Sequence, residues 1–270
     1  MTTKFFENQL RPDRSVISIS GVGALAFLHN LLTCDVATLA QGQAAYGALL
    51  SPQGKILHDI FVFNAGDQIL LDCALEQRDA LLQKLMMYKL RAKLTITSRD
   101  DIEVAVGDEG YVDPRNPEMG HRFFAAKGAF KASEGYDAAR ISLGLADSVQ
   151  DIGSNSLFPH EANLDQFGGV NFTKGCYVGQ EVVSRMQHRG TARSRILPVT
   201  GQGLTKGASI TSADKSIGEI LSTSSTNALA LIRLDRLGDA IAPLLSNAVT
   251  VKVQKPDWIK YDVTIPEAAR

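Results

Sequence analysis

Cysteine is scarce in this chain: its 270 residues include three, Cys34, Cys73 and Cys176. None of them forms a C-x-x-C pair, and an odd number of cysteines argues against a disulfide framework. A closed structural zinc site takes four protein ligands and an iron-sulfur cluster is held by about four thiolates, so this chain alone supplies neither. Cys34 and Cys73 stand in the apolar segments 31–35 and 70–74, which predicts small buried residues.

An excess of charge of either sign is also missing. The chain has 28 lysines and arginines against 29 aspartates and glutamates, a formal net charge of -1, so we expect no nucleic-acid partner and no membrane partner on electrostatic grounds. No apolar run approaches the roughly 18 residues of a membrane span. Residues 1–14 mix charges with Phe5 and Phe6 and lack the apolar core of a secretory signal peptide. The expected location is the cytoplasm.

Several signatures of catalysis are absent from the sequence. It contains no P-loop, no H-E-x-x-H motif and no pattern of a Ser/His/Asp triad, so kinase, zinc-protease and hydrolase functions have no support. A Gly21-x-Gly23 turn before an apolar segment is weakly similar to a dinucleotide-binding fingerprint. Ala26 stands where its third glycine belongs, and no βαβ unit with an acidic strand end follows. The sequence therefore argues against a dinucleotide site.

The sequence does contain an alternation of short strands and helices. Apolar and polar residues alternate over 15–20, and apolar residues recur at spacings of three and four over 24–32, which predicts a strand and then an amphipathic helix. The same criteria predict a hairpin with arms at 46–50 and 55–64 and a third strand at 68–72. They then predict a second helix at 76–89 and a further strand at 92–97. This order is typical of an α+β fold of the split βαβ, ferredoxin-like type.

After Gly190 the pattern changes to short apolar runs separated by Gly, Ser, Asn and Pro. This pattern predicts a small antiparallel β-barrel or sandwich. The runs lie at 195–200, 208–211, 216–222, 228–233 and 249–254. We therefore expect an α+β region at 1–194, made of two interleaved lobes, and a C-terminal β-barrel at 195–270. Residues 144–171 between them show little periodicity, and such long irregular stretches are often functional.

The densest group of reactive and flexible residues is the run Lys174-Gly-Cys-Tyr-Val-Gly-Gln-Glu181. Its two glycines give the backbone freedom for a turn, and residues 181–188 have the mixed pattern of a short helix that ends at Gly190. Cys176 would lie in a turn before this helix, where the helix dipole and the charge of Lys174 both favour its thiolate. Such a thiol is suited to thiol exchange, to transient ligation of sulfur or metal, or to covalent contact with a client protein.

Together with four further segments, this run resembles the YgfZ-type folate-binding proteins. They belong to the superfamily of the glycine cleavage T-protein, a tetrahydrofolate-dependent aminomethyltransferase. The further segments are Phe158-Pro-His-Glu161-Ala-Asn-Leu-Asp165, Arg185-Met-x-His188-Arg189-Gly190, Gly23-Ala-x-Ala-Phe27-Leu-His-Asn-Leu-Leu-Thr33 and Tyr88-Lys-Leu-Arg91. The resemblance implies a T-protein-like fold with three lobes around a central folate-binding opening. It also implies tetrahydrofolate or a derivative as cofactor, and iron-sulfur client or assembly proteins as partners in cluster assembly or repair.

The resemblance assigns individual residues as well. In the T-protein a hairpin strand carries two adjacent aspartates after a Gly-x-Ile-Leu pattern. The matching text here is Gly54-Lys-Ile-Leu-His58-Asp59, so a histidine replaces the first carboxylate, the one important for folate chemistry. The pterin-binding glutamate of a Pro-x-Glu pattern falls on Glu161, and a bidentate carboxylate suits the paired donor edge of a pterin. An arginine expected near the anionic folate tail falls on Arg195, or less closely on Arg193.

These assignments leave alternatives open. His58 and Asp59 are neighbours on a strand and so point to opposite faces, which lets only one of them face a folate pocket. Tyr177 either stacks on a pterin or belongs to the core, and Lys174 is either the partner of the Cys176 thiolate or a solvated loop charge. The leading hypothesis is a folate-binding accessory factor for iron-sulfur clusters. A folate-dependent aminomethyl or one-carbon transferase and a non-enzymatic interaction scaffold are the alternatives.

Overall fold

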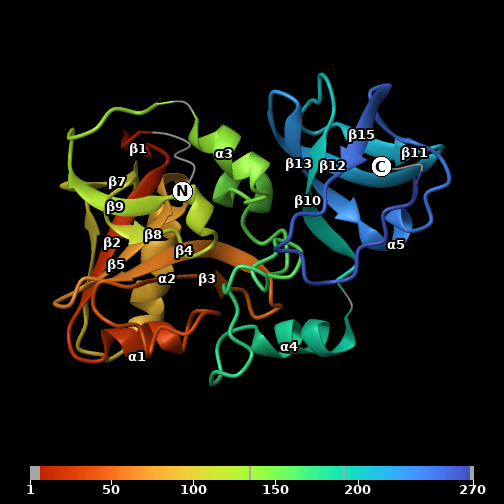
Figure 1. Cartoon of the computed structure of the whole chain (residues 1–270). Coiled ribbons are helices and arrows are strands. Elements are labelled where there is room, and N and C mark those ends of the chain that lie inside the picture. The colour runs from red at the N-terminus through yellow and green to blue at the C-terminus, as the bar shows by residue number, and fades with distance from the viewer. Residues whose placement is uncertain (1–6, 134, 191, 268–270) are drawn as a thin grey trace.

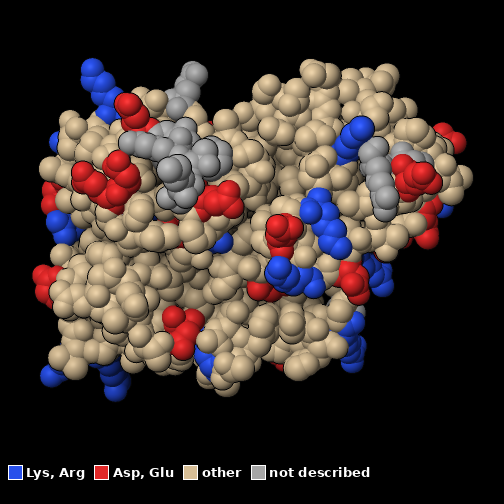
Figure 2. Space-filling model, in the orientation of Figure 1, with Lys and Arg blue, Asp and Glu red and all other residues tan. Residues whose placement is uncertain are grey.

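A computed structural model describes residues 7–133, 135–190 and 192–267 of the chain. Figure 1 shows two bodies side by side, an N-terminal body with sheets and helices and a C-terminal barrel, joined by irregular segments and by helix α4 (Gln180–Arg189). Within the described ranges, no helix is long and apolar enough to cross a membrane. On the face shown in Figure 2, acidic and basic side chains are mixed over both bodies rather than gathered by sign.

The first sheet follows the alternation that the sequence predicts. Its elements are β2 (Arg14–Ser20), α1 (Ala24–His29), β3 (Ala44–Leu50), β4 (Ile56–Asn64), β5 (Ile69–Ala74), the 3-10 turn η1 (Leu75–Gln77), α2 (Arg78–Lys89) and β6 (Thr95–Arg99). The strands lie in the order β3-β4-β5-β2-β6, and every neighbouring pair is antiparallel. Helices α1 and α2 cover one face, where Leu28, Leu32, Leu81 and Leu85 pack on Ile17 and its neighbours.

Helix α1 is shorter than its apolar spacing predicts. The pattern indicates a helix to residue 32, but α1 ends at His29. The chain leaves the helix because Leu32 forms a bridge with Leu49, and the backbone N–H of Thr33 donates to the carbonyl of Ala48 at 3.0 Å. Leu32 stays buried in the same cluster, so burial alone did not distinguish the last turn of a helix from an extended segment.

The second sheet shares the N-terminal segment with the first. Its strands are β1 (Gln9–Leu10), β7 (Ile102–Gly107), β9 (His121–Ala126) and β8 (Tyr111–Val112), in this order. The 3-10 turn η2 (Pro117–Met119) lies between β8 and β9 in the chain, and helix α3 (Tyr136–Ser142) and the π-helical turn η3 (Ser148–Ile152) follow β9. Because β1 pairs with β7 while the next strand, β2, belongs to the first sheet, the two sheets are interleaved along the chain.

The C-terminal body is a closed antiparallel barrel with the strand order β10-β13-β12-β11-β14-β15. Its elements are β10 (Ser194–Thr200), β11 (Ser209–Ser212), β12 (Lys215–Ser224), β13 (Asn227–Arg233), the short helix α5 (Leu234–Leu237), β14 (Leu244–Ser246) and β15 (Val249–Val253). Alternate residues such as Leu197, Val199, Ile210 and Val251 fill its interior, as expected for a small barrel. The α+β fold with a C-terminal β-barrel is therefore confirmed, and the barrel is the correct choice over a sandwich.

A buried ion cluster joins the two sheets. Asp72 of β5 has no exposed side-chain surface; it pairs with Arg14 of β2 at 2.6 Å and with Arg122 of β9, whose Nε lies 3.0 Å away. Asp113 pairs with Arg115 at 2.9 Å and lies 3.6 Å from Arg122. Burial raises the pKa of the Asp113 carboxyl, but the two neighbouring arginines outweigh this effect and hold that pKa below its usual value.

The three cysteines differ in burial. Cys34 and Cys73 lie in the core between the first sheet and its helices, as the apolar surroundings predict, whereas Cys176 is exposed. Burial raises the pKa of both inner thiols to about 12. Gly47 makes room for Cys34, because a Cβ at this position would lie on the Cys34 side chain. The chain therefore presents one accessible thiol to its surroundings.

Replacing Asp72 by asparagine should destabilise the protein strongly. The change leaves the guanidinium groups of Arg14 and Arg122 buried without their counter-charge, and removing one partner of a buried pair costs about 3–5 kcal/mol. Urea unfolding followed by circular dichroism measures this free energy. The control is Asp235→Asn, which removes a half-exposed pair with Arg233 and should cost at most about 1 kcal/mol. Equal losses in the two variants would contradict the role of the cluster.

Alkylation should distinguish the three thiols. We expect iodoacetamide at about pH 8 to modify Cys176 in the native protein and to spare Cys34 and Cys73, which are buried and hardly ionised at that pH. Mass spectrometry of tryptic peptides measures the modification at each site. The same reagent in denaturant is the control, and it should modify all three. Native labelling of Cys34 or Cys73 at the rate of Cys176 would show that the core placement is wrong.

Candidate functional site

Residues 174–179 form an irregular loop that leads into α4, which begins at Gln180. Gly179 caps the start of this helix with a φ of 81°, and a Cβ there would lie 2.6 Å from the carbonyl oxygen of Ser51. Gly54 has the same positive φ, and its Cβ would lie 2.9 Å from Cβ of Val182. The turn between β3 and β4 therefore docks backbone to backbone on the loop, which only glycine permits at these two positions.

Lys174 fastens the loop to the end of α1. Its Nζ donates to the backbone carbonyl oxygens of His29 (2.5 Å), Leu32 (2.6 Å) and Cys34 (2.9 Å). An ammonium group has three donors, so all of them are used. Burial lowers the pKa of Lys174, although the nearby Cys34 and Asp35 act in the opposite direction. The lysine thus anchors backbone rather than donating to the thiolate of Cys176.

Cys176 is exposed, and the two residues that follow it are anchored in the core. Tyr177 packs in the core with Ile56 and Val183, and Val178 packs against the cluster beneath α1 and α2. Burial raises the pKa of Tyr177 to about 12, and its hydroxyl has no hydrogen-bond partner within the described parts of the chain. The side chains that follow Cys176 hold the loop, and the thiol itself faces outwards.

His58 and Asp59 lie on opposite faces of β4. His58 is on the helix-covered face, where Nδ1 lies 3.1 Å from Oε1 of Gln77 and where burial lowers the pKa of the imidazole. Asp59 is on the other face and accepts a hydrogen bond from the hydroxyl of Tyr46 at 3.1 Å. Both side chains are nearly inaccessible. Of the two, Asp59 is the one that faces the interior between the lobes.

Glu161 lies in the irregular segment next to the barrel. Its Oε2 accepts a hydrogen bond from the backbone N–H of Phe158 at 2.9 Å, while Oε1 receives none from the residues that the structure describes. The carboxyl is half-buried, so burial raises its pKa, although the nearby Lys55, Arg195 and Arg233 act in the opposite direction. This leaves a carboxylate oxygen, with positive charges around it, available to a ligand.

Arg195 is committed to partners of its own. Its guanidinium pairs with Asp165 at 2.6 Å, donates to the carbonyl of His160 at 2.6 Å and stacks on the ring of Tyr261 at 4.0 Å. These groups, with α4 and residues 260–262, line a pocket of about 490 Å³. Arg195 Nε and His160 Nδ1 are buried there without a hydrogen-bond partner among the described residues. Arg195 thus lines this pocket, whereas Glu161 is not among its lining residues, although the preceding residue, His160, is.

The structure places the candidates from the sequence in separate locations. Glu161 and Arg195 are neighbours, Cys176 and Lys174 share a loop, and His58 and Asp59 lie on the two faces of β4. Sequence reasoning missed Asp165 and Tyr261 as partners of Arg195, and Tyr261 stands in a segment without a strand pattern that could have drawn attention to it. Across the described residues, no group of three or more His, Cys, Asp or Glu side chains is arranged to hold a metal ion.

Two family models match the chain. Residues 14–106 match the GCVT N-terminal domain, and residues 193–261 match the CAF17, C-terminal beta-barrel domain. A solved structure of the glycine cleavage system aminomethyltransferase T from Bartonella henselae has a TM-score of 0.77 at 14% sequence identity, over 96% of this chain and 88% of that chain. The predicted membership of the T-protein superfamily and the T-protein-like fold are confirmed.

Several curated relatives are named as mitochondrial iron-sulfur cluster assembly factors of the IBA57 type. The protein from Pyricularia oryzae is 30% identical over 85% of this chain and 72% of its own length. The relative from Coccidioides immitis is 32% identical over 69% of this chain, which spans 55% of that protein. The relative from Mus musculus is 27% identical over 91% of this chain and 83% of its own length.

The expected cytoplasmic location is contradicted by these comparisons, because the relatives are named as mitochondrial proteins. The expectation depended on the missing apolar core of a secretory signal, and that absence bears on secretion only. The identity to the Pyricularia oryzae protein extends over most of both chains. This chain belongs to the family of the IBA57 iron-sulfur cluster assembly factors.

Proposed function

We propose that this protein supports the assembly or repair of iron-sulfur clusters in client enzymes. Cys176 is its reactive thiol in this proposal, and tetrahydrofolate or a derivative is its cofactor. The family supports the assembly role, since its members are named for it. The observation that carries the proposal is the exposed Cys176, the one accessible thiol of the chain, in a loop that Lys174 and Gly179 hold in place.

The cluster is the cargo in this proposal, and the chain supplies one ligand for it. Iron-sulfur clusters are held by about four thiolates, and two of the three cysteines of the chain are buried under helices. The thiolate of Cys176 therefore acts together with cysteines of the client. Anchoring of the loop lowers the conformational entropy lost when this thiolate meets the cluster, which favours transient contact.

Folate binding is supported by the chemistry around Glu161. A free carboxylate oxygen in a half-buried position matches the donor edge of a pterin. Lys55 and Arg233 beside it suit the carboxylates of a folate tail. Bound tetrahydrofolate would supply a carrier of one-carbon units. The other assigned residues fit less well, because Arg195 is paired with Asp165 and His58 faces the helices.

A folate-dependent aminomethyl or one-carbon transferase is the second candidate, favoured by the fold shared with an aminomethyltransferase. One residue of β4 argues against a transferase. Where the T-protein has the first of its two adjacent aspartates, this chain has His58, which contacts Gln77 on the helix-covered face. The neighbouring Asp59 is nearly inaccessible behind Tyr46. A purely non-enzymatic scaffold is the third candidate, and it requires neither a folate nor a reactive thiol.

Calorimetric titration with tetrahydrofolate tests the cofactor. We expect binding to the wild type and a loss of about tenfold or more in Glu161→Gln, because an amide presents one acceptor instead of two to the donor edge. The control is Glu181→Gln, which changes an exposed carboxylate that pairs with Arg185 on α4 and should bind as the wild type does. Absence of heat in the wild type at millimolar folate would contradict both folate hypotheses and leave the scaffold.

Complementation tests the thiol. In cells that lack the endogenous protein, Cys176→Ala should restore the activity of iron-sulfur enzymes poorly, since it removes the only accessible thiolate. Thr173→Ala, an exposed change in the same loop, should restore it fully. The measurement is the specific activity of iron-sulfur enzymes at matched amounts of protein. Full restoration by Cys176→Ala would remove the thiol from the proposal.

A further inference from the structure

The helix-covered side of the first sheet carries exposed apolar side chains. Met86 and Met87 on α2 are 48% and 59% exposed, Leu90 just after this helix is 86% exposed, and Val22 before α1 is 100% exposed. We call these four residues the apolar patch. Exposed apolar groups that gather at one surface mark interaction sites, and methionine is frequent at adaptable binding surfaces.

The parts of the apolar patch belong to one surface. The turn with Val22 packs on the segment that follows Leu90, because a Cβ on Gly21 would lie 2.6 Å from the carbonyl oxygen of Lys93 and 3.3 Å from Cα of Leu94. Helices α1 and α2 also share the core cluster beneath them. Two segments that are far apart in the sequence thus meet where their apolar side chains face solvent.

Leu90 is held in a backbone conformation that favours glycine. Its φ is 47° with a ψ of -113°, and such a conformation strains a residue with a Cβ. The side chain packs on little, since most of its surface is exposed. Packing within the fold therefore gives no reason for a leucine at this position, whereas contact with a partner does.

Basic residues flank Met86, Met87 and Leu90 along the chain. The chain has no acidic residue between Asp79 and Asp100. The basic residues in this interval are Lys84, Lys89, Arg91, Lys93 and Arg99, and both Arg91 and Lys93 are exposed. An apolar centre with these basic residues along one rim matches a partner surface with an apolar anchor and acidic groups opposite that rim.

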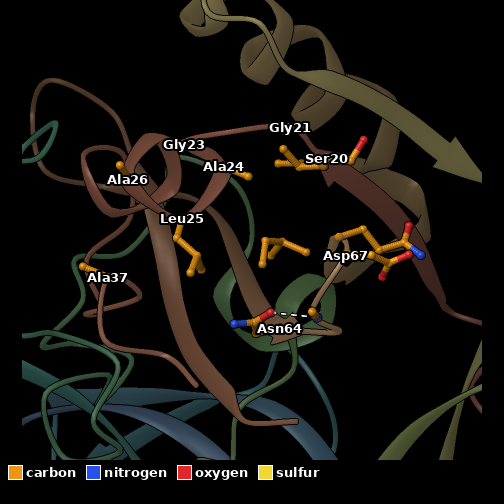
Figure 3. A pocket seen from close by; sticks show the side chains of 13 residues that line it. Ser20, Gly21, Gly23, Ala24, Leu25, Ala26, Ala37, Asn64 and Asp67 are labelled. Atoms are coloured by element: carbon orange, nitrogen blue, oxygen red, sulfur yellow. Dashed lines mark hydrogen bonds between the residues drawn. The ribbon is translucent and has the colours of Figure 1, made fainter. Parts of the chain in front are cut away.

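A pocket of about 400 Å³ opens beside the Val22 turn. In Figure 3, Leu25 of α1 and Asp67 lie on opposite sides of this pocket, and Asn64 lies at its lower edge, where its Oδ1 accepts the backbone N–H of Gly66 at 2.9 Å. Side chains of Ile19 and Ile69 also line it. A hollow of this size accepts one or two anchoring side chains of a partner.

The loop of Cys176 borders the same helix layer. Lys174 binds the carbonyl oxygens at the end of α1, and Val178 packs against the cluster shared by α1 and α2. The six-residue helix α1 thus separates the turn with Val22 from the residues that Lys174 binds, so a protein on the apolar patch would reach the loop of Cys176 across one short helix. The position of the patch therefore suits a client that exchanges cluster ligands with Cys176.

We infer that the apolar patch and its basic rim are the docking surface for an iron-sulfur client protein with an acidic contact face. This inference rests on the proposed function and adds the place and the chemistry of the contact. A membrane fits less well, because the apolar stripe of α2, with Leu81 and Leu85, is turned into the core. The exposed apolar groups come from separate turns beside a pocket, not from one continuous helix face.

Photo-crosslinking in cells tests the contact. A benzoylphenylalanine replaces Met87 in one strain and, as the control, Ile241 in the barrel, which is 89% exposed. We expect adducts at position 87 with iron-sulfur proteins that have acidic surfaces, identified by mass spectrometry, and none of them at position 241. Adducts with lipid, adducts only with proteins that hold no cluster, or no adduct at position 87 would each overturn the inference.

Leu90→Gly separates binding from folding. Glycine relieves the positive φ, so the melting temperature should equal or exceed that of the wild type, while the activity of client enzymes should fall about tenfold as an anchor contact is lost. A structural role would instead lower the melting temperature. Unchanged client activity in Leu90→Gly would overturn the inference.

Charge reversal tests the rim. Lys89→Glu with Lys93→Glu should lower client activity about tenfold at low salt and leave folate binding unchanged, whereas Lys206→Glu with Lys215→Glu, an exposed pair on the barrel, should change neither. Equal effects of the two pairs would contradict the inference.

If Cys176→Ala loses function while the patch variants keep it, the docking surface alone is wrong. If Cys176→Ala behaves as wild type, the thiol is removed from the proposed function, whatever the patch variants show.

Discussion

The carboxylate of Asp72 is the point on which the two sheets depend, because it is shared by Arg14 of its own sheet and Arg122 of the other. Three arginines of this region also lie over the ring of Phe61, with the guanidinium of Arg122 4.0 Å from its centre. The chain has thus placed cations inside, and each must keep its acidic or aromatic neighbour to offset the lost hydration. This requirement holds the two sheets in one relative position. Another arrangement that buried as much apolar surface but separated these ions would leave buried charges unpaired.

The loop of Cys176 is positioned by the first lobe. Gly54 and Gly179 bring the hairpin turn against the loop, and Lys174 binds backbone more than 140 residues earlier in the chain. The irregular segment before the loop connects to the barrel, where the carbonyl of Glu161 accepts the N–H of Ile196 at 2.8 Å. Thiol and carboxylate therefore belong to one irregular stretch that is held at both ends by regular structure, which is how a rigid scaffold positions functional loops.

Local periodicity predicted the strands and helices of the first sheet and five of the six barrel strands, because burial on one face leaves its trace within a few residues; it missed the short strands β1, β8 and β14. It predicted the end of α1 wrongly, since the bridge from Leu32 to Leu49 is a contact between distant segments. The ion pair of Asp72 with Arg122 and the carbonyl contacts of Lys174 left no local pattern for the same reason. The motif around Cys176 could be found by resemblance, but its exposure depends on which neighbours the rest of the fold buries.

The contact between Gly54 and Gly179 has a mechanical consequence. Two backbones that touch without side chains between them have almost no freedom to slide, so the hairpin and the thiol loop move as one piece. A displacement of the thiol loop is then carried along β3 and β4 into the first sheet, and also into α4, whose Val182 packs on Gly54. A partner that pulls on the thiol therefore also displaces the hairpin and the sheet to which it belongs.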